Sequence, residues 1–201
     1  MRLLQKTIVL IVTLLAFALI PALRATTFMR LSPEQMAAAA TFVVRARCVG
    51  SIVLVDRGEI WTLTSFETRE AWKGAPPETL RVRLLGGRTR ELTSQVSGVP
   101  RFRPGEDVVL FLVPEKSGGY SIVSWAQGTF RVHRDPASRA LVITQDTAAY
   151  GFRLSERASH PPEIVRDTPL EEFRRRIQSA SASAAAAPSL APARAANRRQ
   201  P

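Results

Sequence analysis

The chain has 201 residues, of which 28 are lysine or arginine and 17 are aspartate or glutamate, giving a formal net charge of +11. This length suits one domain with a hydrophobic core and a tail. The excess positive charge lies at the two ends, whereas basic and acidic residues are nearly balanced across residues 26–173. Composition therefore argues against a nucleic-acid partner. The single cysteine, Cys48, excludes an intramolecular disulfide.

The first 25 residues have the pattern of a secretory signal peptide. Arg2 and Lys6 precede an uncharged apolar run, and alanines follow Pro21. We therefore expect cleavage after Ala25, or alternatively after Ala22, with export to the periplasm or the extracellular space. The other interpretation is an uncleaved anchor in the inner membrane, because the charge-free run reaches the lower length limit of a spanning helix. Contact with the membrane is expected only in that second case.

A short helix is predicted directly after this segment. Ser32 can cap the first turn, Pro33 suits the first helical position, and Gln35 can close a capping box. The alanines that follow favour the helix until Thr41, where β-branched residues begin. The helix should lead directly into the first strand.

The middle of the chain is predicted to be all-β, because its apolar residues recur with a period close to two. Two long strands, 42–55 and 60–72, are joined by a tight turn. Strands of this length usually bend, and a bulge at Gly50 or between Leu63 and Phe66 would let the sheet curl. The pattern therefore favours a curved sheet over a flat one.

Five later strands are predicted at 80–84, 108–113, 120–125, 128–135 and 141–143. The run 108–113 has no polar alternation, which predicts a central strand covered on both faces. We expect a mainly β fold: a small OB-like closed barrel of five core strands plus an added hairpin, flanked by an N-terminal and a C-terminal helix. A two-sheet sandwich is the alternative.

The segment between Leu85 and Glu106 has no clear periodicity and is unusually long for a loop in a compact domain. Such loops often bind ligands, so it is the candidate binding loop. Its candidate site residues are Arg88, Arg90, Arg101, Phe102 and Arg103. The alternative is a crossover that caps one end of the barrel, with Phe102 inserted and the arginines in solvent.

A final helix is predicted near the C-terminus. Thr168 and Pro169 repeat the cap and first-turn pattern of the first helix. Leu170, Phe173 and Ile177 would form its apolar face. We therefore expect a single domain over residues 26–178, followed by a disordered tail rich in Ala, Ser, Pro and Arg over 179–201.

No constellation of catalytic or metal-binding residues is recognisable in the sequence. His133 falls on the exposed side of a predicted strand, and His160 precedes two prolines in a linker. Cys48 shares its face with apolar residues and is predicted to be buried as a small apolar group. Nucleophile elbows, zinc-binding spacings and phosphate loops do not occur. We therefore expect no catalytic residue, no metal site, no cofactor and no enzymatic activity.

Three segments, Glu70–Gly74, Leu92–Glu106 and Trp125–Val132, resemble a group of exported bacterial proteins encountered especially in acidobacteria. The resemblance extends from Trp61 to Asp146 and covers most of the expected folded domain. It implies the fold but no catalytic residue, because none is assigned in that group.

A more distant similarity is to the netrin-like barrels of tissue metalloproteinase inhibitors, which also have an OB-type fold after a signal peptide. Those inhibitors bind the protease zinc through an N-terminal cysteine. This chain would begin at Thr26 after cleavage and has no cysteine before Cys48. The inhibitory mechanism therefore does not carry over.

Together these features predict an exported, non-enzymatic module of the cell envelope or extracellular space. It would bind a protein partner through the candidate loop or a face of the barrel. Two alternatives remain open. An envelope enzyme would need a deep pocket joining His133 to carboxylates, and a purely structural accessory protein would show only small, scattered apolar patches. The sequence does not define the oligomeric state.

Overall fold

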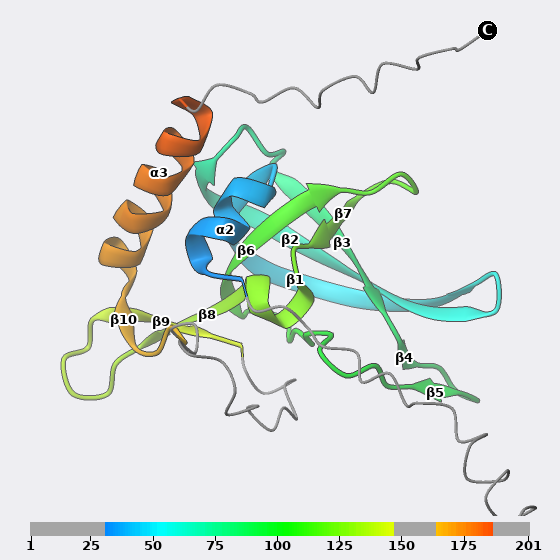
Figure 1. The fold of residues 1–201 in the computed structure, drawn as a ribbon. Helices are drawn as coiled ribbons and strands as arrows, with labels where there is room; N and C mark the ends of the chain where they lie inside the picture. Colours follow the sequence, from blue (N-terminus) through cyan, green and yellow to red (C-terminus); the bar gives the residue numbers. More distant parts are fainter. Residues whose placement is uncertain (1–30, 147–163, 187–201) are drawn as a thin grey trace, which may run out of the picture.

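The computed structural model describes residues 31–146 and 164–186 (Figure 1). The predicted signal peptide, His160 and residues 187–201 of the predicted tail lie outside the described residues. The helices are α2 (Pro33–Ala39), α3 (Leu170–Ala186) and a short 3-10 helix (Trp125–Gly128). The strands are β1 (Phe42–Asp56), β2 (Glu59–Lys73), β3 (Thr79–Leu85), β4 (Gly87–Arg88), β5 (Thr93–Ser94), β6 (Asp107–Pro114), β7 (Tyr120–Ile122), β8 (Thr129–Arg134), β9 (Leu141–Gln145) and β10 (Thr168–Pro169). Within the described ranges, no helix is long and apolar enough to span a membrane.

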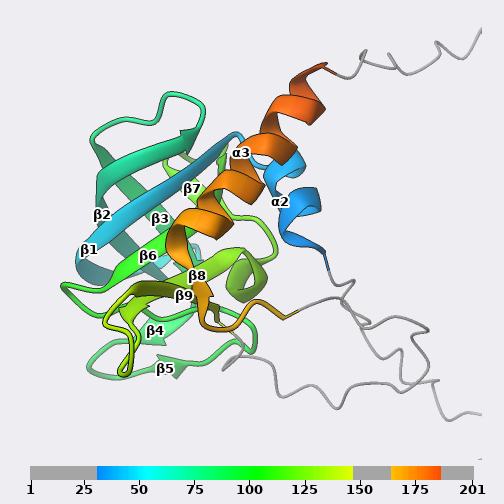
Figure 2. The same ribbon diagram turned by 90° about the vertical axis from the view of Figure 1, so that its left-hand side faces the viewer.

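The fold is mainly β with two α-helices in the described residues, as predicted. One sheet has the strand order β1-β2-β3-β7-β6-β8-β9-β10, and β1 also pairs with β6. Neighbouring strands of this sheet are antiparallel except β3 and β7, which are parallel and pair at Val82 and Tyr120. β4 and β5 form a separate short hairpin. The strands curve strongly, and both α-helices lie on one side of the sheet (Figures 1 and 2).

β6 is covered on both faces, which confirms the prediction for 108–113. One face contributes Val109 and Phe111 to the outer cluster, which packs beneath α2 and α3. The outer cluster consists of Met36, Ala37, Ala40, Val43, Trp72, Val109, Phe111, Phe130, Ile143, Val165, Leu170, Phe173 and Ile177. The other face contributes to the inner cluster, which consists of Val44, Ala46, Cys48, Phe66, Leu80, Val82, Leu84, Val99, Val108, Leu110, Leu112 and Ile122. β6 therefore contributes to both cores, one from each of its faces.

The long β1–β2 hairpin contains the bulge predicted near Gly50. Cys48 pairs with Phe66 and Gly50 pairs with Ser65, so Val49 is an extra residue with no partner on β2. Because side chains alternate along a strand, one extra residue exchanges the two faces of β1 beyond it. This exchange determines which side chains of the outer half of the hairpin face inward.

The bulge expected between Leu63 and Phe66 is wrong. β2 pairs with β3 residue by residue through this stretch, and its alternate residues stay buried from Ile60 to Phe66. The extra residues of β2 lie farther along, opposite the steps Val43–Val44 and Arg45–Ala46 of β1. The long antiparallel partner β3 keeps the Leu63 region regular.

α2 has the predicted capping box. Ser32 Oγ accepts a hydrogen bond from the Gln35 amide at 3.2 Å, and Gln35 Oε1 accepts one from the Ser32 amide at 2.8 Å. At the other end of the helix, Lys73 Nζ donates to the main-chain oxygens of Ala37 and Ala40, both at 2.6 Å. A cation from β2 thus satisfies carbonyl groups that the helix leaves free.

One strand is shorter than the sequence predicts, and the described residues contain more strands than expected. The strand expected over 120–125 ends at Ile122, and Trp125 instead begins the 3-10 helix. A Cβ on Gly128 would lie 2.2 Å from the Val123 oxygen, so this tight turn depends on a glycine. The structure also contains three two-residue strands, β4, β5 and β10, that the sequence did not predict. With them the described residues contain ten strands, whereas six or seven were expected.

α3 buries Leu170, Phe173 and Ile177, as predicted. It begins one residue later than expected, because Thr168 and Pro169 pair with β9. It also continues through Ala186, into the range 179–201 for which the sequence indicates disorder. The alanines of this stretch have high helix propensity, which extends the helix beyond its buried face.

Candidate functional site

A pocket of about 370 Å³ lies between the β1–β2 hairpin and the candidate loop. The hairpin contributes Ser51, Val53, Thr62 and Thr64, β3 contributes Leu84, and the loop contributes Gly87, Arg88, Thr93, Ser94, Gln95, Arg101 and Phe102. This volume lies in the range of sites that hold a small ligand or a few side chains of a partner.

The inner wall of the pocket follows from the bulge at Val49. Beyond it, Ser51 pairs with Thr64 and Val53 pairs with Thr62, and residues paired across antiparallel strands share a face. The hydroxyl groups of Ser51 and Thr64 are hydrogen-bonded at 2.8 Å. Polar side chains therefore continue the inner face where the apolar inner cluster ends.

Arg101 reaches this wall from the loop. Its Nη1 donates to Thr62 Oγ1 and to the main-chain oxygen of Gly86, both at 3.2 Å, while Thr62 Oγ1 itself donates to Gly86 O at 2.7 Å. Gly86 has a φ of +84°, and a Cβ there would lie 2.6 Å from the Ser94 oxygen. The local turn thus requires glycine and holds the guanidinium of Arg101 against the hairpin.

Phe102 packs edge-on against Phe66, with ring centroids 4.9 Å apart, and is half-buried against the inner cluster. Insertion of this ring is the feature expected if the loop caps one end of the barrel. The loop nevertheless also lines the pocket, so one segment closes the core and presents polar groups beside it.

The five candidate residues divide into two groups. Arg88, Arg101 and Phe102 line the pocket together. Arg90 and Arg103 are exposed and are not among the residues lining it. The candidate site therefore includes fewer loop residues than the sequence indicated. It also includes hydroxyl groups of the β1–β2 hairpin.

Arg131 of β8 is a supporting residue that the sequence analysis missed. Its guanidinium donates to Glu106 Oε2 at 2.6 Å, to Asp146 Oδ2 at 2.7 Å and to the main-chain oxygen of Arg101 at 2.8 Å. It also lies 5.6 Å from the centre of the Phe102 ring. Burial alone would lower the pKa of Arg131, but the two carboxylates outweigh it and raise the pKa above its ordinary value.

The charge of the pocket has one sign. Arg88 and Arg101 are the charged residues that line it, and no carboxylate belongs to the described lining. Arg101 donates to neutral oxygens there rather than to a carboxylate. The site is therefore suited to an anionic group accompanied by apolar atoms, since Val53, Leu84 and Phe102 complete its wall.

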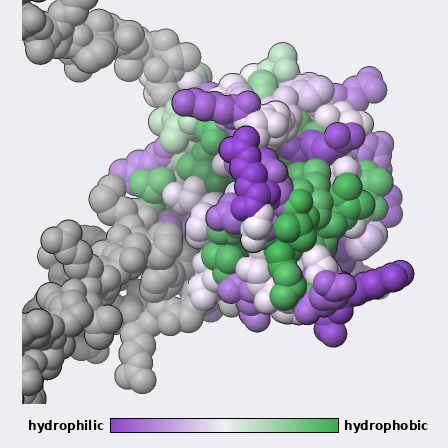
Figure 3. Space-filling view, turned by 90° about the vertical axis from the view of Figure 1, so that its right-hand side faces the viewer, coloured by the Kyte–Doolittle hydropathy of each residue, from purple (hydrophilic) through white to green (hydrophobic). Residues whose placement is uncertain are grey.

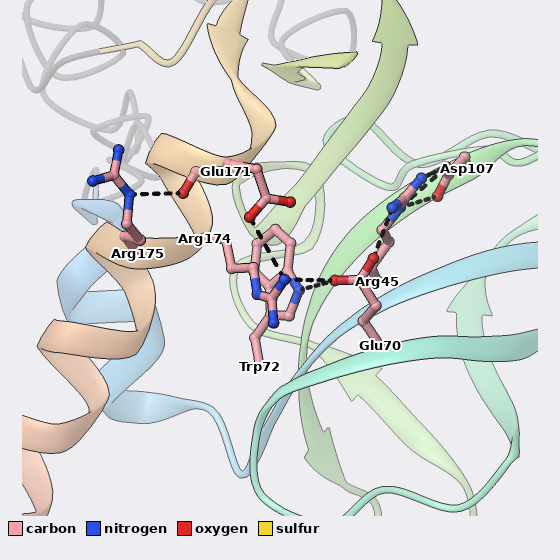
Figure 4. Close-up of polar contacts among 7 residues, drawn as sticks. All are labelled: Arg45, Glu70, Trp72, Asp107, Glu171, Arg174 and Arg175. Atoms are coloured by element: carbon pink, nitrogen blue, oxygen red, sulfur yellow. Dashed lines mark hydrogen bonds and ion pairs between the residues drawn. The ribbon is translucent and has the colours of Figure 1, made fainter. Parts of the chain in front are cut away.

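A second polar cluster, around Glu70, lies between the sheet and α3 (Figure 4). Arg45 bridges Glu70 at 2.8 Å and Asp107 at 2.6 Å, and Trp72 Nε1 donates to Glu70 Oε2 at 3.1 Å. Arg174 of α3 approaches the same carboxylate at 3.5 Å. Burial would raise the pKa of Glu70, but these donors and cations outweigh it and lower the pKa. The ionised Glu70 side chain lies between Arg45 of the sheet and Arg174 of α3, and these ion pairs help to fix α3 to the sheet.

Neither His133 nor Cys48 contributes to the pocket lining. His133 Nε2 contacts Asp167 Oδ1 at 3.1 Å, and its side chain is 44% exposed, as the strand pattern predicts. Cys48 is buried, as predicted, and burial raises the pKa of its thiol. Within residues 31–146 and 164–186, no group of three His, Cys, Asp or Glu side chains could hold a metal ion.

Exposed apolar side chains of β1 lie in and beside the pocket, with Val53 lining it and Ile52 on the opposite face of the strand. Val49, Ile52, Val53 and Val55 are 59%, 65%, 38% and 55% exposed, and we call these four residues of β1 the hairpin patch. Figure 3 views the side of the molecule toward which the hairpin projects, and hydrophobic side chains gather there. Exposed valine and isoleucine side chains collected on one strand are typical of an interaction surface.

No protein-family model, curated protein or solved structure matches this chain. The candidate site therefore rests on its own geometry and chemistry.

Proposed function

We propose that this chain is an exported, non-enzymatic binding module of the cell envelope or extracellular space, which binds a protein partner at the pocket beside the hairpin patch. The observation that carries the proposal is that Arg88 and Arg101 line a pocket with no described carboxylate, next to exposed apolar residues of β1. Apolar contact area with a few directed charges is the composition of a protein-binding site.

An OB-type closed barrel is part of this proposal. The strand pairings can be followed from β1 through β2, β3, β7 and β6 back to β1, which supports closure. The weakest step is between β3 and β7, which pair only at Val82 and Tyr120. The resemblance to exported bacterial proteins and to netrin-like barrels agrees with such a fold, and the N-terminal sequence supports export.

The arrangement of apolar residues favours binding over a purely structural role. A structural accessory protein would show small, scattered patches, whereas four exposed residues of this chain lie close together on β1. An envelope enzyme would be favoured by a pocket joining His133 to carboxylates, and His133 lies outside the pocket lining described above. A binding module is therefore the better-supported proposal.

Affinity capture with a matched pair of variants tests the proposal. The full chain is immobilised, exposed to envelope and secreted fractions of the source organism, and the captured proteins are quantified by mass spectrometry. Arg88→Glu/Arg101→Glu reverses the two arginines that line the pocket, and Arg90→Glu/Arg103→Glu reverses two loop arginines that do not. Both variants change the net charge equally, and thermal unfolding checks that both fold.

We expect a partner that the wild type and Arg90→Glu/Arg103→Glu capture and that Arg88→Glu/Arg101→Glu loses. Equal loss in both variants would indicate attraction by net charge alone and would count against the pocket. Capture that is unchanged in both would place the binding surface elsewhere.

A further inference from the structure

We propose that the partner binds as an extended peptide segment, which adds a strand to the open edge of β1 and places an acidic side chain in the pocket. This inference rests on the proposed function, and it names the chemistry of the partner at the same site. Strand addition uses main-chain hydrogen bonds for affinity and alternate side chains for specificity.

β1 loses its second neighbour halfway along its length. β6 pairs with β1 from Phe42 to Arg47, and Cys48 then exchanges main-chain hydrogen bonds of 2.8 Å with Gly105 and Glu106. Beyond Cys48, β1 stays paired with β2 up to Asp56, but no strand of the described chain pairs with its other edge. Residues 49–56 therefore present an open strand edge.

Beyond the bulge at Val49, this edge carries no charged side chain up to Val55 and no proline that would block pairing. Exposed edge strands are commonly protected by charged side chains, proline or bulges. Residues 49–55 read Val-Gly-Ser-Ile-Val-Leu-Val, with no charge and no proline. The edge coincides with the hairpin patch, in which Ile52 is 65% exposed. Its apolar side chains and its main chain are thus available to the same ligand.

The pocket lies on one face of this edge. Ser51 and Val53 both line the pocket, and residues of an added strand that stand opposite them would share their face. Alternate side chains of the peptide would therefore enter the pocket beside Arg101, and the intervening ones would lie on the face that carries Ile52. The pocket would therefore contact the side chain of every second residue of the peptide.

Charge complementarity selects the ligand. The charged residues of the pocket lining are Arg88 and Arg101. An inward aspartate or glutamate would accept charge-assisted hydrogen bonds from Arg101, and a β-branched side chain two positions away, on the same face of the peptide, would cover Val53. A second copy of this chain fits less well, because its own uncharged edge would bring no anion to these arginines.

The test is selection from a displayed library of random ten-residue peptides on the immobilised full chain. We expect the enriched sequences to combine β-branched residues in alternate positions with one aspartate or glutamate. The best sequence is then synthesised in three forms: unchanged, with its acidic residue replaced by the amide, and with alternate main-chain nitrogens methylated so that strand pairing is blocked.

We expect the amide form to bind about tenfold or more weakly, as for loss of a charged hydrogen bond, and the methylated form not to bind. Arg101→Gln should weaken the unchanged peptide by a similar factor and leave the amide form unaffected, because the two changes remove the same contact. Arg103→Gln is the matched control and should bind all three forms like the wild type.

Peptides without an acidic residue, equal binding of the methylated form, or failure to select any peptide would each overturn the inference. Concentration-dependent dimerisation that peptide does not reverse would assign the edge to a second copy and overturn it as well. A partner captured through Arg88 and Arg101 in the absence of any peptide binding would leave the proposed function standing. Specific peptide binding by a wild-type chain that captures no partner protein would reject the function and retain the strand-addition site.

Discussion

Arg131 and Arg101 are joined by a hydrogen bond of 2.8 Å, from Nη2 of Arg131 to the main-chain oxygen of Arg101. The same guanidinium binds Glu106 and Asp146, so β8 holds both sides of the loop segment that carries Phe102. Arg101, one of the two arginines that line the pocket, is thus positioned by Arg131, which lies outside the lining. Arg131 therefore links the stability of this segment to the position of the pocket residue Arg101.

Arg131→Met should lower the free energy of unfolding by about 2 to 3 kcal/mol, because it keeps much of the apolar stem and removes the partner of two carboxylates. Because Arg131 and Glu106 are partly exposed, we expect a smaller loss than for a fully buried ion pair. Urea unfolding measures the change. Arg134→Met is the control, since Arg134 is exposed and donates to the Arg139 oxygen. Equal effects of the two substitutions would contradict the anchoring role of Arg131.

Gly86→Ala should destabilise the protein much more than Gly58→Ala. Both glycines have nearly the same φ, +84° and +83°, so the backbone strain is matched. A Cβ at position 86 would lie 2.6 Å from the Ser94 oxygen, whereas nothing lies within 4 Å of one at position 58. We expect about 1 kcal/mol of strain for Gly58→Ala and a clearly larger loss for Gly86→Ala in thermal unfolding. Similar losses would show that the loop yields to the added methyl group.

Glu70→Gln should reduce stability at neutral pH and have a smaller effect in acid. The pKa of Glu70 is lowered in the folded protein from its ordinary value of 4.5, so its ionised form stabilises the fold above that value. This contribution is lost as the pH falls through the lower folded pKa. Urea midpoints measured from pH 7 to 3 should therefore converge for the wild type and the variant. Glu172→Gln, at an exposed position of α3, removes the same charge and is the control; its urea midpoint at pH 7 should stay close to that of the wild type.

Phe173→Ala should cost about 3 to 5 kcal/mol of stability, as expected for a large aromatic side chain removed from a core. Phe173 is fully buried and contacts Trp72 and Phe130, with ring centroids 6.2 and 4.9 Å apart. It therefore fixes α3 against the sheet. Urea unfolding gives the loss, and faster amide exchange in α3 than in β2 would show that the helix detaches first. A loss below about 1 kcal/mol would mean that α3 contributes little to the core.

Local patterns in the sequence predicted the elements that depend on local chemistry. The capping box at Ser32, the doubly buried β6 and the bulge beside Gly50 each follow from residues close together in the chain. β10 pairs with β9 at two residues, and β3 pairs with β7 at one. These contacts join residues far apart in the chain, so no periodic pattern in the sequence predicts them. The end of the strand at Ile122 likewise depends on the tight fit of Gly128 against Val123.

The sequence predicted the part of the candidate site that the loop contributes, but not the part that the hairpin contributes. The aperiodic loop indicated Arg88, Arg101 and Phe102, which do line the pocket. The hairpin wall was missed, although Thr62 and Thr64 alternate on the inner face of β2 and an uncharged run follows the bulge on β1. Arg131 gave no signal, because a strand arginine with distant carboxylate partners looks the same in sequence as one in solvent.

The most direct test of the account is amide hydrogen exchange of the full chain with and without its captured partner, read by mass spectrometry. If the partner binds at the pocket and the open edge, residues 49–56 and 93–95 should exchange more slowly in the complex, while exchange in α2 and α3 stays unchanged. Slower exchange confined to the helices, with no change in residues 49–56, would contradict the central claim that this pocket and its strand edge form the binding site.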